Sequence, residues 1–185
     1  AIENGSFKRE ITPVTVPGRG GATDILIDEQ PGKARLDRIP TLKPAFAKDG
    51  TVTAANSSSI SDGAAALVMM RQSEAERRGR APIARVLGHA THAAAPAWFT
   101  TAPVGASQKL LDRVDWTKDA VDLYEVNEAF AVVAMLAMKE LDLPHDKVNI
   151  HGGACALGHP IGASGARILV TLLAALQTHG LTRGV

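Results

Sequence analysis

The strongest constraint on the fold is the apolar run ILVTLLAAL (residues 168–176), which follows the glycine-rich stretch GGACALGHPIGASGAR (residues 152–167). A helix here, closed by Gly180, has almost no polar face between Ala166 and Leu176. A helix that apolar must be enclosed on most sides. We therefore expect it to be buried, as it would be in the middle layer of a sandwich.

Strand and helix patterns alternate about four times from residue 51 onward. Apolar runs predict strands at 64–70, 83–90, 121–126 and 147–153. Helical patterns follow at 73–79, 103–114, 127–141 and 164–180. In the first helix, Ser73 and Glu76 predict a capping box, and Gly79 predicts the end. The alternation predicts a layered α/β fold with a largely buried sheet.

Residues 1–50 have a different character. They are dense in turn residues, as in VPGRGGATD and DEQPGK. This composition predicts an extended, loop-rich segment with short strands.

Composition limits the class of protein. The 20 basic and 19 acidic residues nearly balance, so the charge favours neither nucleic acid nor a membrane surface. A single cysteine excludes an internal disulfide and fits a reducing compartment. We find no signal peptide and no apolar run of transmembrane length, which predicts a soluble chain. Both ends look like cuts through a larger protein, because the chain lacks an initiator methionine and stops just after a helix.

His159 lies between a predicted strand end and the N-terminus of the last helix. The partial positive charge of that terminus disfavours protonation of an imidazole. A neutral imidazole suits a general base or a donor to a developing oxyanion, and Gly158 and Gly162 leave room for a substrate. The alternative is a histidine that caps a turn, beside glycines needed only for positive φ. The loop lacks both the G-K-[ST] and the G-x-G-x-x-G patterns, so we do not expect it to bind phosphate.

Three other polar features have two interpretations each. Asn127 either caps the helix that follows it or holds a water or carbonyl oxygen at the C-terminal edge of a strand. The stretch NSSSISDG (residues 56–63) is either a turn or the lining of a ligand channel. Cys155, the only thiol, is either a nucleophile paired with His159 or a buried residue away from any helix N-terminus.

Two motifs, NEAF at 127–130 and GGACALGHPIGASGAR at 152–167, together resemble those of the thiolase family, the acyl-CoA acetyltransferases. The likeness extends upstream through FKREITPVTV, LKPAF, DGTVTAANSSSISDGAAALVM and SEAERRG, and so covers nearly the whole chain. The resemblance implies an αβαβα layered sandwich of two similar halves, of which this chain is an incomplete part. Residues 1–50 then correspond to the end of an inserted loop domain, and residues 51–185 to the C-terminal domain without its last strands.

The resemblance also implies a chemistry. In this family a cysteine takes an acyl group from coenzyme A and an acetyl-CoA enolate attacks it, or the reverse occurs in thiolysis. His159 then activates the nucleophile and helps to bind the thioester oxygen, while Asn127 holds a water in the same oxyanion hole. Ser58 contacts the pantetheine arm. The walls of the substrate tunnel are formed by Phe99, Ala129 and Phe130.

The partners implied by the resemblance are acetyl-CoA or another acyl-CoA, the remainder of the thiolase chain, and further copies in a homodimer or homotetramer. The compartment implied is the cytoplasm. No metal and no cofactor are implied, because the coenzyme A thioester is itself the substrate.

The chain departs from the family pattern in two respects. The nucleophilic cysteine belongs to the family's first half and the acid/base cysteine to a C-x-G-G-G motif after residue 185, so Cys155 is not expected to be the nucleophile. The segment FTTAPVGA (99–106) differs from the usual M-G-x-G-P.

The sequence predicts a thiolase represented by part of its chain, or alternatively a truncated, non-catalytic paralogue that binds CoA esters or acts as an assembly partner. A ketoacyl synthase relative would share the sandwich, but the NEAF motif argues against it.

Overall fold

The structure is a computed structural model that describes residues 1–185. Its strands and α-helices are β1 (Val14–Gly18), β2 (Gly21–Ile25), α1 (Gln72–Arg77), α2 (Ala102–Val114), α3 (Ala131–Leu141), α4 (Ala154–Leu157) and α5 (Ile161–His179). Short 3-10 helices lie at Ser6–Arg9, Pro31–Lys33, Leu36–Thr41, Ala54–Asn56, Pro96–Thr101, Lys118–Ala120 and His145–Lys147.

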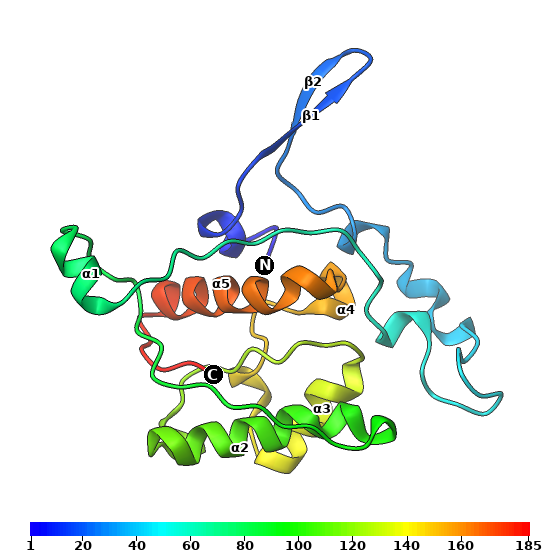
Figure 1. The fold of residues 1–185 in the computed structure, drawn as a ribbon. Coiled ribbons are helices and arrows are strands. Elements are labelled where there is room, and N and C mark those ends of the chain that lie inside the picture. The colour runs from blue at the N-terminus through cyan, green and yellow to red at the C-terminus, as the bar shows by residue number, and fades with distance from the viewer.

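Three short segments, joined by isolated parallel bridges, form the centre of the molecule. Tyr124 pairs in parallel with Val148, and Leu123 pairs in parallel with Gly184. The segment 121–126 therefore lies between 147–149 and 183–185. Helix α5 lies on one side of these segments, and α2 and α3 lie on the other (Figure 1). This arrangement is the layered α/β fold that the sequence predicts.

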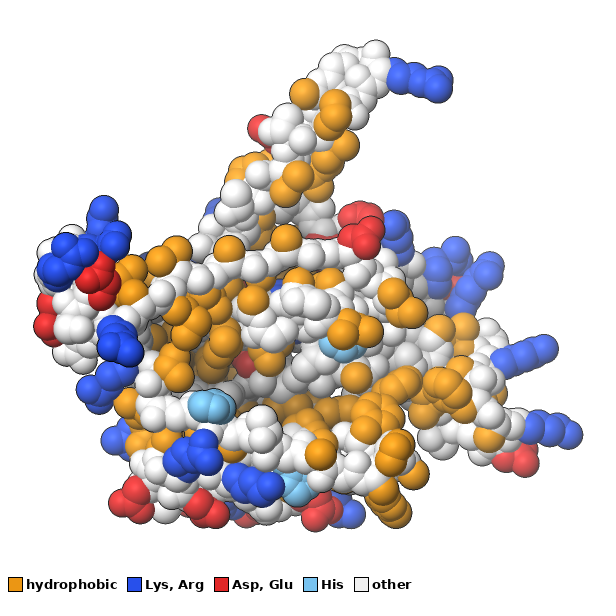
Figure 2. Space-filling model, viewed as in Figure 1, with side chains coloured by type: hydrophobic (Ala, Val, Ile, Leu, Met, Phe, Trp, Pro, Cys, Tyr) orange, Lys and Arg blue, Asp and Glu red, His pale blue; other side chains and the backbone are white.

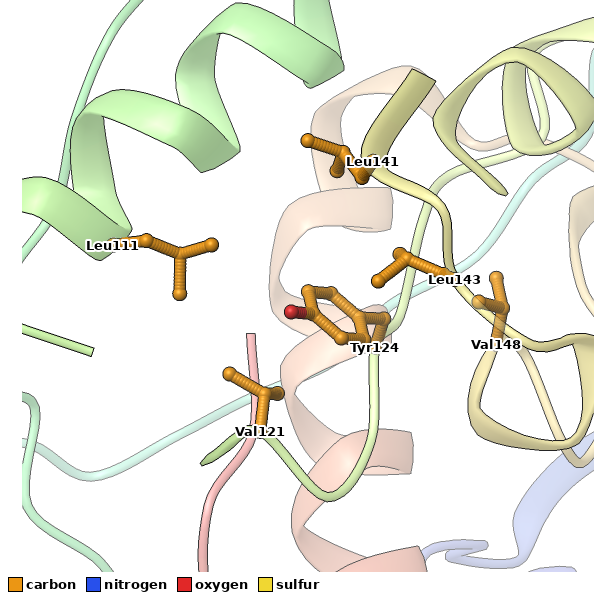
Figure 3. Close-up of a cluster of buried hydrophobic side chains, with 6 residues drawn as sticks. All are labelled: Leu111, Val121, Tyr124, Leu141, Leu143 and Val148. Carbon is orange, nitrogen blue, oxygen red and sulfur yellow. The ribbon is translucent and has the colours of Figure 1, made fainter. Parts of the chain in front are cut away.

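Apolar side chains fill both sides of the central segments. On the side of α2 and α3, six buried residues form one cluster: Leu111, Val121, Tyr124, Leu141, Leu143 and Val148 (Figure 3). On the other side, Leu123 packs against Leu172, Ala175 and Leu176 of α5. Because side chains alternate along an extended segment, Tyr124 contributes to the first cluster and its neighbour Leu123 to the second.

Helix α5 is less enclosed than the sequence predicts. Its buried residues include Ser164, Thr171 and Leu176, but Leu169 is 45% exposed. The helix is also long and apolar enough to cross a membrane, by length and composition only. The sequence analysis expected no apolar run of transmembrane length. That expectation is wrong, because α5 begins at Ile161 and so reaches 19 residues. One such helix is weak evidence for a membrane span, since the core helix of a soluble protein passes the same test.

Two of the four predicted strands do not pair in this structure, and a third, at 147–153, is reduced to the single bridge at Val148 because the chain turns at Asn149 and Gly152, which have positive φ. Residues 64–70 and 83–90 are extended but unpaired, and their side chains point largely into solvent. Val68 is 90% exposed and Ile83 is 71% exposed. The prediction of strands there is wrong for this chain because strand hydrogen bonds require a neighbouring strand, and none lies beside these residues.

The helix boundaries show which local signals held. Gly79 and Gly180 end α1 and α5 with positive φ, as predicted. The predicted capping box is wrong, because Ser73 lies inside α1 and its N-cap, Arg71, makes no side-chain capping bond. Helix α3 begins at Ala131 instead of residue 127.

The N-terminal segment is extended and loop-rich, as the sequence predicts. Strands β1 and β2 pair antiparallel with Val14 opposite Ile25, and every residue of both strands is exposed. The hairpin projects away from the helices (Figure 1).

Candidate active site

His159 and Asn127 meet at one point although 32 residues separate them in the chain. The Nδ2 atom of Asn127 lies 3.4 Å from Nε2 of His159, and both side chains are partly buried. His159 directly precedes Pro160, the N-cap of α5, and Asn127 follows the central segment 121–126. The structure therefore brings together the two residues on which the sequence analysis depends most.

The hydrogen bonds of His159 define which ring nitrogen carries the proton. Ser164 Oγ lies 2.6 Å from Nδ1 and donates its own proton to the carbonyl oxygen of Pro160 (3.1 Å). In this arrangement the hydroxyl accepts from Nδ1–H. The Asn127 amide nitrogen is also a donor, so Nε2 must accept. Both contacts fit one tautomer, in which Nδ1 carries the proton and Nε2, facing the site, does not.

Asn127 does not cap a helix. The N-cap of α3 is Phe130, and the Oδ1 atom of Asn127 is buried without a hydrogen-bond partner within the chain. Buried polar atoms are nearly always hydrogen-bonded. The capping interpretation is thus excluded, and Oδ1 remains able to accept a hydrogen bond from a water or a ligand.

The serine-rich stretch connects the two halves of the site. Ser58 bonds to the carbonyl oxygen of Ala129 through both its backbone N–H (3.2 Å) and its Oγ (2.8 Å). The backbone N–H of His159 donates to the carbonyl oxygen of Ser59 (2.8 Å). At Gly158, where φ is +86°, a Cβ would lie 2.2 Å from Ser61 Oγ. The stretch is therefore a wall of the site and not only a turn.

Aromatic rings lie beside this wall. Phe99 and Phe130 meet edge to face with 6.1 Å between centroids, and Phe46 meets Phe130 in the same way at 6.0 Å. The sequence analysis named Phe99, Ala129 and Phe130 but missed Phe46, whose only sequence signal is its place in LKPAF. Phe46 and Phe99 remain 77% and 50% exposed, so the rings present apolar surface to solvent.

Shallow hollows adjoin the site. One of about 420 Å³ lies between residues 61–65 and 160–163, immediately beyond His159. Another of about 470 Å³ lies between residues 25–30 and 61–62. Figure 2 shows hydrophobic side chains gathered on this face, which is hollowed between α5 and the helices below it. Neither hollow has His159 or Asn127 in its lining.

Cys155 is not suited to act as a nucleophile. It lies in the first turn of α4, which corrects the expectation that no helix begins near it. Burial, and then the nearby carboxylate of Glu128, raise the pKa of the thiol to about 11. At neutral pH the sulfur is therefore a thiol, whereas the thiolate is the nucleophilic form.

A buried ion pair lies behind the site. Arg167 of α5 lies 3.8 Å from the carboxylate of Glu125, whose side chain is only 4% exposed. Burial raises the pKa of Glu125 to about 7, Arg167 partly opposes that rise, and Glu10 and Glu128 add to it. The pair connects the central segment 121–126 to α5, close to both site residues.

Sequence reasoning missed Ser164 and Glu128 as members of the site. Ser164 was visible as the serine of the G-H-P-x-G-x-S-G pattern, and its helical spacing from Pro160 was the available signal. Glu128 was visible as the residue after Asn127, but its contacts are with residues 149–155, which no local pattern reveals.

Two family models match the chain. The family model described as the thiolase C-terminal domain matches residues 80–185, and that of the thiolase N-terminal domain matches residues 1–73. The chain belongs to the thiolase family. The expected end of the loop domain near residue 50 stays a prediction, because these matches do not mark it.

Individual relatives carry more specific names. The chain is 49% identical to a probable acetyl-CoA acetyltransferase of Dictyostelium discoideum and 48% identical to the cytosolic acetyl-CoA acetyltransferase of Mus musculus. In both comparisons the whole chain is covered, with 45% and 47% of the relative. The chain thus spans about half the length of the curated relatives it matches.

Solved structures share the fold. The acetyl-CoA acetyltransferase of Bacillus anthracis matches with a TM-score of 0.94 and 42% identity, over 100% of this chain and 47% of that one. The human mitochondrial 3-ketoacyl-CoA thiolase matches with a TM-score of 0.88 and 34% identity, over 97% and 46%. The fold is therefore an incomplete thiolase-type α/β sandwich, as the resemblance implies.

Proposed function

We propose that this chain supplies the histidine and asparagine of a thiolase active site, which makes or cleaves 3-ketoacyl-CoA or acetoacetyl-CoA. The observation that carries the proposal is the 3.4 Å approach of Asn127 Nδ2 to His159 Nε2, with His159 held in one tautomer. The names of the relatives support the substrate class, since acetyl-CoA acetyltransferases act on acetyl-CoA.

His159 would act first as a base. Its unprotonated Nε2 takes the proton of a cysteine thiol. In condensation the resulting thiolate attacks the thioester carbonyl and displaces coenzyme A as its thiolate; in thiolysis it attacks the 3-keto carbonyl and the acetyl-CoA enolate leaves. Cys155 is a poor candidate for that thiol because its pKa is about 11. The nucleophile would therefore come from the remainder of the thiolase chain.

The protonated His159 would then act as a donor. Protonation of Nε2 ends the hydrogen bond that Asn127 Nδ2 donates to it, so the new Nε2–H is available to the substrate, and Asn127 Oδ1 has a free acceptor position for a water. An Nε2–H and a water held by Asn127 could both donate to the thioester or enolate oxygen. Donors fixed before the reaction stabilise such an oxyanion without reorganisation.

The serine wall and the aromatic rings would bind the rest of the substrate. Ser58 Oγ donates its proton to the carbonyl oxygen of Ala129. Its lone pairs remain able to accept from an amide N–H of the pantetheine arm. Phe99 and Phe130, with Ala129 between the wall and Phe130, would cover the apolar part of the arm. No cofactor or metal is required by this scheme.

We propose that the complete protein is a cytoplasmic homo-oligomer, a dimer or tetramer. The cytosolic naming of the mouse relative supports the compartment. The exposed apolar side chains of the β1–β2 hairpin, such as Val14 and Ile25, support self-association. Cell fractionation and light scattering on the full-length protein test these two statements, and a nuclear or monomeric protein would contradict them.

The activity is tested by thiolysis of acetoacetyl-CoA with the full-length protein and its His159→Ala variant. Loss of a base costs about 10²–10⁴ in rate and loss of an oxyanion donor about 10²–10³. Both roles belong to one side chain, so we expect kcat to fall by at least about 10³ with little change in CoA-ester binding. Asn127→Ala should cost less, because its water is partly replaceable.

The alternative is a non-catalytic relative that binds CoA esters or assists assembly. It predicts a folded full-length protein that binds acetyl-CoA but turns over no substrate. The proposed function would therefore be overturned if the full-length protein, without any substitution, had no thiolase activity.

A further inference from the structure

Glu128 connects the segment of Asn127 to the segment that leads to His159. Its Oε1 atom accepts a hydrogen bond from Asn149 Nδ2 (2.9 Å), and its Oε2 atom accepts one from the backbone N–H of Cys155 (3.1 Å). Both oxygens of the carboxylate are therefore used, and each faces a donor.

Each of these contacts leads to a site residue. Asn149 also accepts from the backbone N–H of Val126 (2.7 Å) and donates to its carbonyl oxygen (2.8 Å), which fixes the chain just before Asn127. Cys155 lies in the first turn of α4, and α4 is followed directly by Gly158 and His159. Glu128 thus fixes the start of the short helix that leads to His159.

Gly153 shows how closely the two segments approach. A Cβ placed on Gly153 would lie 2.5 Å from the carboxyl carbon of Glu128 and 2.6 Å from Oε2. The φ of Gly153 is −154°, an extended conformation that any residue adopts. Glycine is therefore needed at 153 because the Glu128 carboxylate occupies the space, and not because of the backbone angle.

We propose that Glu128 is a positioning residue, which sets the separation of His159 and Asn127 through residues 149–158. The inference rests on the proposed function for its catalytic consequence. A carboxylate suits this role because it offers two acceptor oxygens, whereas an amide offers one acceptor and a donor that would face another donor. The charge also strengthens both hydrogen bonds.

The first test compares Glu128→Gln with unmodified full-length protein in acetoacetyl-CoA thiolysis. A misplacement of about 1 Å at a reacting group costs about 10² in rate. We expect kcat per folded protomer to fall by about 10- to 100-fold while KM stays within about 3-fold, because Glu128 does not contact the substrate. Glu140→Gln, an exposed acid near the end of α3, is the matched control and should keep the full kcat.

The second test is a double-mutant cycle between Glu128→Ala and Gly153→Ala. Gly153→Ala alone should lower kcat, because the new methyl group must displace the carboxylate. In the Glu128→Ala protein the same change should cost less than about 2-fold, since the clash is gone. Interaction between contacting residues appears as such non-additivity, whereas independent damage to folding would add.

Hydrogen exchange provides a readout that does not require activity. Glu128→Gln should increase amide exchange in the peptide spanning residues 153–159, and Glu140→Gln should not. A kcat for Glu128→Gln within about 2-fold of the unmodified protein, an additive cycle, or unchanged exchange at 153–159 would each overturn the inference. If the unmodified protein lacks thiolase activity, the proposed function fails, and the exchange at 153–159 alone decides whether Glu128 positions this loop.

Discussion

Replacing Ser164 by alanine tests the tautomer argument directly. Ser164 is 4% exposed, and its Oγ is the acceptor for Nδ1–H of His159 at 2.6 Å. The variant removes this acceptor and leaves a methyl group in place of the hydroxymethyl group. A buried donor left without a partner costs about 1–3 kcal/mol.

That cost translates into a loss of activity. With His159 in the tautomer shown, Nδ1–H becomes the unsatisfied donor in Ser164→Ala, so the competing tautomer or a rotated ring becomes more favourable by the same amount. An energy of about 1–3 kcal/mol is a factor of about 5–150 in an equilibrium constant. We therefore expect kcat in acetoacetyl-CoA thiolysis to fall by more than about 2-fold and by at most about 150-fold, less than for His159→Ala.

The assay needs a second readout and a control. Imidazole ¹⁵N NMR on the full-length protein should show protonated Nδ1 and unprotonated Nε2 for His159, and a mixture of tautomers in Ser164→Ala. Ser73→Ala, at an exposed position of α1, should change neither kcat nor the spectrum. The reasoning is refuted if Ser164→Ala keeps kcat within about 2-fold, or if unmodified His159 carries its proton on Nε2.

Three further changes have defined outcomes. Cys155→Ala should lower kcat by less than about 3-fold. Because the pKa of the Cys155 thiol is about 11, its alkylation at pH 7, measured by mass spectrometry, should be slow. A loss of kcat as large as that of His159→Ala would make Cys155 the nucleophile. The pKa of Glu125 is about 7 in the folded protein, above its ordinary value of 4.5. Between these pH values the folded state binds more protons than the unfolded state, so the free energy of unfolding falls as pH rises. Denaturant unfolding at pH 5 and pH 8 should show a loss of at most about 2–3 kcal/mol from this group, absent in Glu125→Gln, and an identical pH dependence in both proteins would contradict the assignment. The isolated 1–185 chain should not melt cooperatively, because it exposes large side chains such as Val68; a monodisperse chain with a sharp calorimetric transition would show this to be wrong.

Local sequence signals predicted the parts of the fold that local chemistry determines. Pro103 near the start of α2 and Gly180 after α5 placed those helices to within a few residues. The start of α3 was wrong because Phe130 pairs with Ser57 and Ala129 accepts two bonds from Ser58, which keeps residues 127–130 extended. These contacts join residues about 70 positions apart, and no propensity of the NEAF stretch reveals them.

In the site too, some features were available from the sequence and others depend on long-range contacts. Its two main residues, His159 and Asn127, were named through the resemblance of two motifs to the thiolase family, since residue type and position alone left a capping alternative open for each. The roles of Ser164 and Glu128 depend on hydrogen-bond direction, which needs the positions of Pro160 O and Cys155 N–H. Serine and glutamate occur in many surroundings, so their presence in a motif does not show which group they bind.

The unpaired segment 64–70 also bears on the site. It continues directly from the serine wall, where Ser59 O accepts the backbone N–H of His159 at 2.8 Å. At one end this stretch is held by the Ser57–Phe130 bridge, and at the other it reaches Val68, which is 90% exposed. A backbone hydrogen bond is only as well fixed as the segment that accepts it, and segments with few buried contacts open most easily. The position of His159 therefore depends on how well residues 57–70 are packed, as well as on α4, α5 and the contacts of its own ring.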